Sequence, residues 1–135
     1  MTTILAHLTI RPGMEARFEE IGRDMVKQTT SNEEGCIRYE YWRGAEPGKY
    51  YVLLAFRDAV SFYEHQASDW HEGYTPALRE CFEDIRLEVL DPVPAASPLP
   101  PTAAQEVPDD ASEAVKRHGG TYRISRQPWW DAIGK

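Results

Sequence analysis

Residues 50–73, YYVLLAFRDAVSFYEHQASDWHEG, restrict the fold of this chain more than any other stretch. The first half alternates as a strand, and it is apolar on both faces. These faces are Tyr51, Leu53 and Ala55 on one side, and Val52, Leu54 and Phe56 on the other. Apolarity on two sides indicates burial on two sides. One face is therefore expected to pack against helices and the other against a different surface. A helix follows at once, with Asp58 suited to cap it.

The same periodicities assign the other elements of the fold. We expect strands at residues 3–11, 36–42, 49–57 and 84–90, and helices at 14–30, 59–67 and from the Ser68-Asp69 pair to about residue 82. The order β-α-β-β-α-β predicts a ferredoxin-like α+β fold with an antiparallel four-stranded sheet. Helices on one side leave an apolar sheet face open, which a second subunit would cover. We therefore expect a homodimer with its two sheets packed face to face, as a dimeric α/β barrel.

Alternation within the strands predicts which side chains share a face. In the second strand, one face should carry Ile37, Tyr39 and Tyr41, and the other Arg38, Glu40 and Trp42. In the last strand, Ile85, Leu87 and Val89 should point inward.

The composition changes abruptly after residue 91, where the predicted domain of residues 1–91 ends. Residues 92–112 are rich in proline and predict an extended linker without a core. Residues 113–135 form a basic tail with a strand-like TYRIS and a Trp129-Trp130 pair. Two adjacent tryptophans are expected to dock, on their own domain or on the partner subunit, with a separate protein partner as the alternative. The net charge is +3 in the tail and −7 in residues 1–91, so the two segments can attract each other.

Composition excludes several classes of protein. The net charge of −7 argues against general nucleic-acid binding. No apolar run approaches the roughly 20 residues of a membrane span, and the N-terminus lacks the layout of a signal peptide. A cytoplasmic protein without nucleic-acid or membrane partners is the resulting expectation. Cys36 and Cys81 are then expected to be reduced thiols that act as small core residues.

Three features together resemble the antibiotic biosynthesis monooxygenase domain family, in particular its quinol-monooxygenase branch. They are RPG at residues 11–13, EEGC at residues 33–36 and the strand that leads into the helix with His65. The resemblance covers about residues 3–91. It implies a dimeric α+β barrel that oxidises a phenolic or quinol substrate with O2, without metal or flavin. His65 matches the helix histidine of the family, and a later family histidine falls near Trp70-His71.

One position departs from the family pattern. The family often has Glu-x-Trp at the end of the third strand, where this chain has Leu54-Ala55-Phe56 and so lacks a carboxylate. This departure keeps other functions open: a non-catalytic binding or assembly subunit that uses the tail, or an isomerase or cyclase on the same fold. Haem-degrading enzymes of this fold are a further alternative, although His7 stands where they have an asparagine and His65 where they have a tryptophan.

Cofactor-free oxidation of a phenol needs a base with a pKa near neutrality, an apolar slot for the ring and donors for developing oxygen charge. His65 is the candidate base. The candidate substrate-binding residues are His7, Tyr39, Tyr41, Tyr51, Phe56, Tyr63, Trp70 and His71. His65, His71 and Glu72 match no common metal-ligand spacing, so no metal site is expected. The expected partners are a small aromatic substrate and O2.

Overall fold

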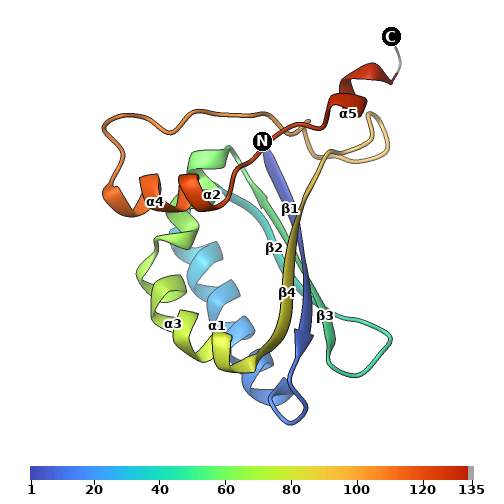
Figure 1. Cartoon of the computed structure of the whole chain (residues 1–135), viewed down its shortest axis with the longest axis vertical. Helices are drawn as coiled ribbons and strands as arrows, with labels where there is room; N and C mark the ends of the chain where they lie inside the picture. The colour runs from blue at the N-terminus through green and yellow to red at the C-terminus, as the bar shows by residue number, and fades with distance from the viewer. Residues whose placement is uncertain (134–135) are drawn as a thin grey trace.

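The structure is a computed structural model that describes residues 1–133. The last two residues of the predicted tail lie outside this range. The domain contains β1 (Thr2–Ile10), α1 (Glu15–Asn32), β2 (Cys36–Arg43), β3 (Lys49–Phe56), α2 (Ala59–Gln66), α3 (Asp69–Cys81) and β4 (Phe82–Leu90) (Figure 1). It is followed by α4 (Glu113–Thr121) and α5 (Pro128–Ala132). None of the helices in this described part combines the length and the apolarity needed to cross a membrane.

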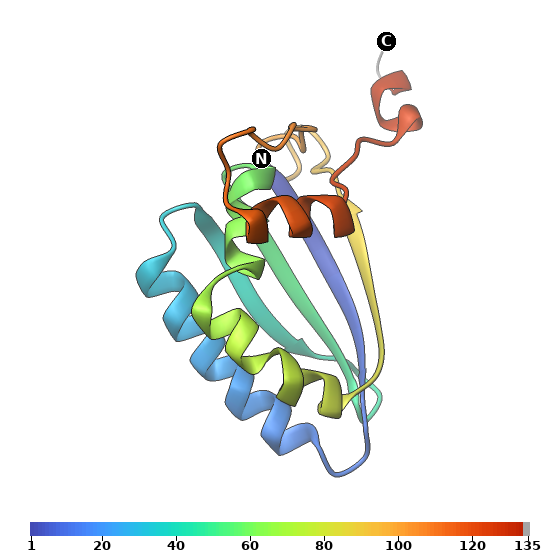
Figure 2. The same cartoon turned by 60° about the vertical axis from the view of Figure 1, so that its left-hand side comes forward.

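The four strands form one antiparallel sheet in the order β2-β3-β1-β4. This order confirms the predicted ferredoxin-like α+β fold, with the second helix divided into α2 and α3. Asp58 caps α2 by accepting a hydrogen bond from the Ser61 N–H (2.7 Å), and Ser68 caps α3 by accepting from His71 N–H (3.3 Å). Helices α1, α2 and α3 all lie on one face of the sheet (Figure 2).

The core lies between the sheet and these helices. From β1 it takes Ile4, Ala6, Leu8 and Ile10, and from α1 it takes Phe18, Ile21 and Met25. In β4, Val89 pairs with Ile4, Leu87 with Ala6 and Ile85 with Leu8, so the predicted inward face of this strand is confirmed. Cys36 and Cys81 are free thiols that pack in or against the core, as predicted.

The predicted face pattern of the second strand is wrong at Ile37. The register shifts between Cys36, which pairs with Phe56, and Arg38, which pairs with Ala55. Ile37 is the extra residue of this irregularity and is 50% exposed, whereas Tyr39 is buried. A bulge re-aims one side chain and leaves the alternation intact on either side of it.

The segment between β4 and α4 follows the end of the domain without helix or strand of its own. The Thr102 hydroxyl donates to the Leu90 carbonyl (2.6 Å), and the Ala103 N–H donates to the Met1 carbonyl (3.0 Å). Helix α4 then packs on α2, and Val115 joins the hydrophobic core. Ile124, in the extended chain after α4, joins the core as well.

One expectation for the tail is wrong. TYRIS forms no strand: Thr121 is the last residue of α4, and residues 122–127 lead without helix or strand to α5 (Figure 1). Trp129 is 62% exposed on its own chain, so its docking on the partner subunit or on a separate protein stays a prediction. Trp130 lies beneath the Arg126 guanidinium, 5.8 Å from the ring centroid.

Candidate active site

A cavity of about 410 Å³ lies between the helix-covered face of the sheet and the helices. Its walls are mainly apolar, with Leu8, Phe18, Met25, Leu54 and Phe62 among them. The polar side chains in the wall are Tyr39, Tyr41, His65, Gln66, His71, Thr75, Arg79, His118 and Tyr122. An apolar chamber with a few polar groups is typical of a small-molecule site.

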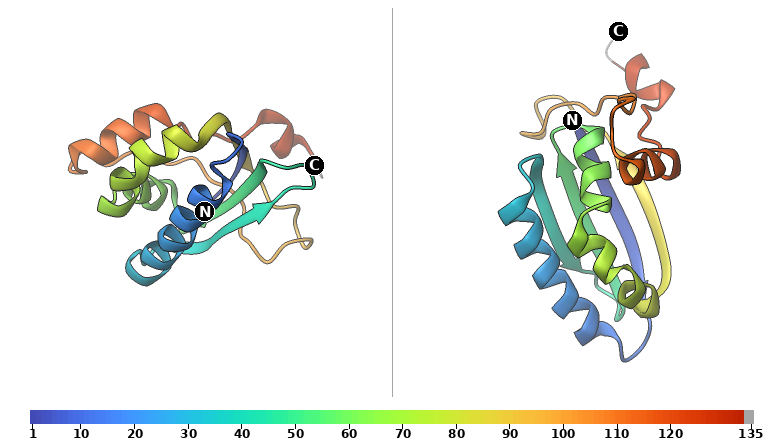
Figure 3. Two further views of the ribbon diagram at one scale, coloured as in Figure 1. Left: turned by 90° about the horizontal axis from the view of Figure 1, so that it is seen from below. Right: turned by 90° about the vertical axis from the view of Figure 1, so that its left-hand side faces the viewer.

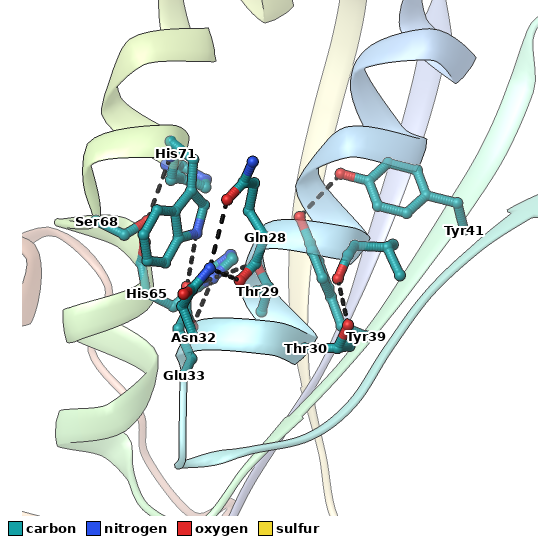
Figure 4. Close-up of polar contacts among 12 residues, drawn as sticks. Gln28, Thr29, Thr30, Asn32, Glu33, Tyr39, Tyr41, His65, Ser68 and His71 are labelled. Atoms are coloured by element: carbon teal, nitrogen blue, oxygen red, sulfur yellow. Dashed lines mark hydrogen bonds and ion pairs between the residues drawn. The ribbon is translucent and has the colours of Figure 1, made fainter.

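The central polar contact of the site is a hydrogen bond between His65, which lines the cavity, and Glu33 behind it. His65 is fully buried, and its Nδ1 lies 3.0 Å from both carboxylate oxygens of Glu33. The Trp70 indole N–H donates to Glu33 Oε1 (2.8 Å), and Thr29 Oγ1 lies 3.5 Å from His65 Nδ1. Figure 4 shows this group between the end of α1 and the α2–α3 corner. The carboxylate therefore has two donors and is fixed in place.

The turn after α1 explains how Glu33 reaches His65. Glu33 follows the last residue of α1, and its N–H donates to the Thr29 carbonyl (2.9 Å). Gly35 then passes so close to α2 that an added Cβ would lie 2.5 Å from Ser61 Cβ. Only glycine permits this approach. The EEGC turn is thus pressed against the helix that carries His65.

Glu33 also determines which nitrogen of His65 carries the proton. A carboxylate accepts from Nδ1–H, so in the neutral ring Nε2 is left as the acceptor. His65 Nε2 is buried and has no hydrogen-bond partner in residues 1–133. The rings packed around the His65 ring belong to Tyr39 (4.9 Å between centroids), His71 (5.0 Å) and Phe56 (5.1 Å). In this tautomer, Nε2 is an acceptor that no described residue satisfies.

His71 lies beside His65, with ring centroids 5.0 Å apart. Its pKa is lowered to about 3, mainly by burial and to a smaller extent by the neighbouring His65 and His118. Its Nδ1 is buried and also lacks a hydrogen-bond partner among the described residues. Both rings line the cavity, so the site has two unpartnered imidazole nitrogens.

Tyr39 and Tyr41 supply hydroxyl groups on the sheet side. Their oxygens are 2.9 Å apart in a hydrogen bond (Figure 4). Burial raises the pKa of Tyr41 to about 12 and raises that of Tyr39 as well. Both therefore remain phenols at neutral pH. One hydroxyl donates to the other, which leaves one O–H of the pair to donate to an oxygen in the cavity.

The structure divides the predicted site residues into four groups. Tyr39, Tyr41, His65 and His71 line the cavity, and Phe56 and Trp70 contact the His65–Glu33 pair. Tyr63 is buried outside the cavity wall, near Gly119 of α4.

His7 and Tyr51 are not brought to this cavity. They pair across β1 and β3 on the opposite face of the sheet, with ring centroids 5.6 Å apart. His7 Nε2 is hydrogen-bonded to Glu88 (2.8 Å). The sheet therefore separates these two side chains from the cavity.

Glu33, beside the cavity, and five polar residues of its wall were not predicted; these five are Gln66, Thr75, Arg79, His118 and Tyr122. Glu33 belongs to EEGC, which the sequence offers only as a fold marker. Its carboxylate enters from α1, whereas the expected carboxylate position, Leu54, forms part of the apolar wall. His118 and Tyr122 come from the predicted tail, and no local pattern links them to the cavity. Among the described residues, no group of three or more His, Cys, Asp or Glu side chains is arranged to hold a metal ion.

Comparison with known proteins agrees with this fold. A protein from Caulobacter crescentus, classed with the antibiotic biosynthesis monooxygenases, is 26% identical, with a TM-score of 0.65 over 68% of this chain and 89% of its own. A conserved protein of Methanosarcina mazei is 23% identical, with a TM-score of 0.62 over 66% and 89% of the two chains. An antibiotic biosynthesis monooxygenase of known structure is 21% identical, with a TM-score of 0.64 over 70% and 100%.

A search of the curated proteins found no match. The family model "Antibiotic biosynthesis monooxygenase" matches residues 1–77, which include Glu33, His65 and His71. The chain therefore belongs to the antibiotic biosynthesis monooxygenase family.

Proposed function

We propose that this protein is a monooxygenase that oxidises a phenolic or quinol substrate with O2, with His65 as the base. The observation that supports this most is the Glu33–His65 pair, because it leaves an unpartnered acceptor, Nε2, in the wall of an apolar cavity. Nε2 is covered by neighbouring rings, so a substrate hydroxyl reaches it when His71 or Tyr39 shifts. Both of these side chains line the cavity.

The proposed reaction starts with transfer of a quinol proton to His65 Nε2. The Glu33 carboxylate stabilises the imidazolium that forms, as a carboxylate does in a catalytic triad. The quinolate passes one electron to O2, and the two radicals combine into a ring-carbon peroxide anion. His65 returns the proton, and loss of water leaves a hydroxyquinone. One oxygen atom enters the product, the other becomes water, and the substrate supplies all four electrons, so no further reductant is needed.

The tyrosine pair has a defined part in this proposal. Negative charge develops on oxygen in the quinolate and again in the peroxide. Buried hydroxyl donors stabilise such charge more than water does, because they are already oriented. The Tyr39 ring packs against His65, and its hydroxyl is hydrogen-bonded to that of Tyr41.

The test is O2 consumption with reduced 1,4-dihydroxynaphthalene under ¹⁸O2, with a protein-free control for autoxidation. The expected result is uptake above the control, with one ¹⁸O in the product and one in water. His65→Ala should lower the rate by about 100-fold or more, as expected for a general base. Uptake at the rate of the control, or equal uptake by His65→Ala, would contradict the proposal.

A second function, protein binding through the tail, is supported by a separate observation. Trp129 is 62% exposed and Val93 67% exposed, although both are large apolar side chains. Trp129→Ser should abolish binding of a partner and leave the domain folded. Truncation after residue 93 is unsuitable for this test, because Val115 and Ile124 belong to the core. A set of bound proteins identical for the two forms would rule this function out.

A further inference from the structure

Helix α4 lies outside the part of the chain that the family model matches, yet it forms part of the cavity wall. The family match ends at residue 77, and the three solved structures described above cover 66–70% of this chain. His118 of α4 and Tyr122, the residue after it, both line the cavity. Figure 3 shows α4 on the helix side of the sheet, next to α2.

The residues from α4 lie where the cavity opens to solvent. Wall residues such as Phe18, Phe62 and His65 are buried, whereas Ile85 on β4 is 48% exposed and Arg79 on α3 is exposed. His118 and Tyr122 are intermediate between these extremes. The mouth of the cavity is therefore bounded by α3, β4 and α4.

Contacts on both sides hold α4 in this position. Glu72 of α3 accepts from Arg117 Nη2 (2.7 Å) and from His118 Nε2 (3.1 Å). The Tyr122 ring meets Phe62 edge-on at 5.8 Å and stacks on His118 at 5.9 Å. An added Cβ on Gly119 would lie 2.5 Å from Val107, so the helix fits closely against the preceding segment as well.

We propose that α4 is the selectivity wall of this site, with Tyr122 and His118 as the residues that choose polycyclic phenols over single-ring phenols. This inference rests on the proposed function. The Tyr122 ring offers a stacking surface for an outer ring of the substrate. Because Glu72 accepts from His118 Nε2–H, Nδ1 of the neutral ring is the acceptor for a substrate hydroxyl. A cavity of about 410 Å³ falls in the size range of sites for multi-ring ligands.

The test measures binding rather than turnover. Dissociation constants are determined anaerobically by calorimetry for 1,4-dihydroxybenzene and for 1,8-dihydroxyanthrone. In Tyr122→Ala, the three-ring compound should lose about 10-fold in affinity relative to the single-ring compound, the discrimination typical of one lost apolar contact. Tyr122→Phe keeps the stacking ring, so the ratio of the two dissociation constants should stay at the wild-type value.

A second pair of variants leaves the residues of the wall intact. Glu72→Gln removes the charge that holds Arg117 and His118. As in Tyr122→Ala, the three-ring compound should lose affinity relative to the single-ring compound. Glu113→Gln is the matched control, because Glu113 is on α4, is 93% exposed in its side chain and pairs only with Lys116 in the described residues.

Each outcome decides one of the two proposals. Ratios that stay at the wild-type value in Tyr122→Ala and Glu72→Gln overturn the role of α4. Wild-type protein that binds neither phenol overturns both the substrate class and the role of α4. Binding with the expected ratios but without O2 uptake overturns the oxidation alone and leaves α4 as a selectivity wall.

Discussion

Glu33 and His65 are separated by 32 positions in the chain and joined by a 3.0 Å contact in the structure. At the scale of single residues, this contact brings a carboxylate to the candidate base, although Leu54 stands where the sequence pattern led us to expect one. The Trp70 N–H adds a second donor to Glu33, and Thr29 Oγ1 lies 3.5 Å from His65 Nδ1. The arrangement resembles the base and orienting carboxylate of a triad, in which the carboxylate fixes the tautomer of the histidine.

Glu33→Gln should therefore lower the rate of quinol oxidation by about 100-fold, the scale of general-base catalysis. The amide is similar in size to the carboxylate but carries no charge to stabilise the imidazolium. The rate is measured as O2 uptake, and the tautomer of His65 by ¹⁵N NMR. Glu34→Gln is the control, because Glu34 is the next residue and is exposed. Equal rates for the two variants would contradict a role for Glu33.

His71 leads to a prediction on stability and pH. Its pKa is about 3 in the folded protein, mainly through burial, and about 6.5 in an unfolded chain. Below pH 6.5 the unfolded state binds a proton that the folded state does not. Stability is therefore lost as the pH falls through this window, by up to about 1.4 kcal/mol per pH unit.

His71→Gln should remove this loss. Between pH 7 and pH 5, the free energy of unfolding in urea should fall by about 2 kcal/mol more in the wild type than in the variant. His7→Gln serves as control, because His7 lies on the other sheet face and is partly exposed. A pH dependence shared by wild type and His71→Gln would show that His71 is protonated in the folded state.

At the scale of helices and strands, α4 and the residues after it belong to the packed domain. Ile124→Ala should lower the free energy of unfolding by about 2–3 kcal/mol, because Ile124 is 8% exposed and contacts the core. Ile133→Ala should change it by less than about 0.5 kcal/mol, because Ile133 is 70% exposed. Urea denaturation at pH 7 measures both. Equal, small effects would mean that this segment folds separately from the domain.

Some helices and strands can be predicted from the sequence, and other features of the fold cannot. Alternation in β1 and the three- and four-residue spacing in α1 predict both elements and their buried faces, because local periodicity determines which side chains can reach the core. The bulge at Ile37 leaves no such trace, since the extra residue is visible only in the pairing with β3. TYRIS has the composition of a strand but no neighbouring edge with which to pair.

The site could likewise be predicted only where it depends on local sequence, and not where it depends on tertiary contacts. His65 follows from its place on a helix after an apolar strand. Its partner Glu33 depends on the close approach of Gly35 to Ser61, which is a tertiary contact. The roles of His118 and Tyr122 depend on the path of the chain after β4, and proline-rich composition does not specify that path.

At the scale of the whole molecule, the open face of the sheet has the layout of a protein interface. The central strands β1 and β3 place Leu5 opposite Leu53 on this face. The outer strands carry ion pairs, Arg38–Glu40 on β2 and Arg86–Glu88 on β4. An apolar centre with a charged rim is typical of subunit contacts. We therefore expect two copies of this chain to pack these faces together.

Leu53→Arg should convert this dimer into monomers. Face-to-face packing would bury two added guanidinium groups at the centre of the interface. The carboxylate opposite each of them, Glu40, is already paired with Arg38, and burial of a charge without a free partner costs several kcal/mol. Light scattering after size-exclusion chromatography should give twice the chain mass for the wild type and the single chain mass for the variant. Glu64→Arg, an exposed change on α2, should leave the dimer intact. A monomeric wild type would contradict the dimer, and a Leu53→Arg variant that is still dimeric would place the interface elsewhere.

Leu53→Arg should also retain phenol binding, because the cavity lies on the helix side of one subunit.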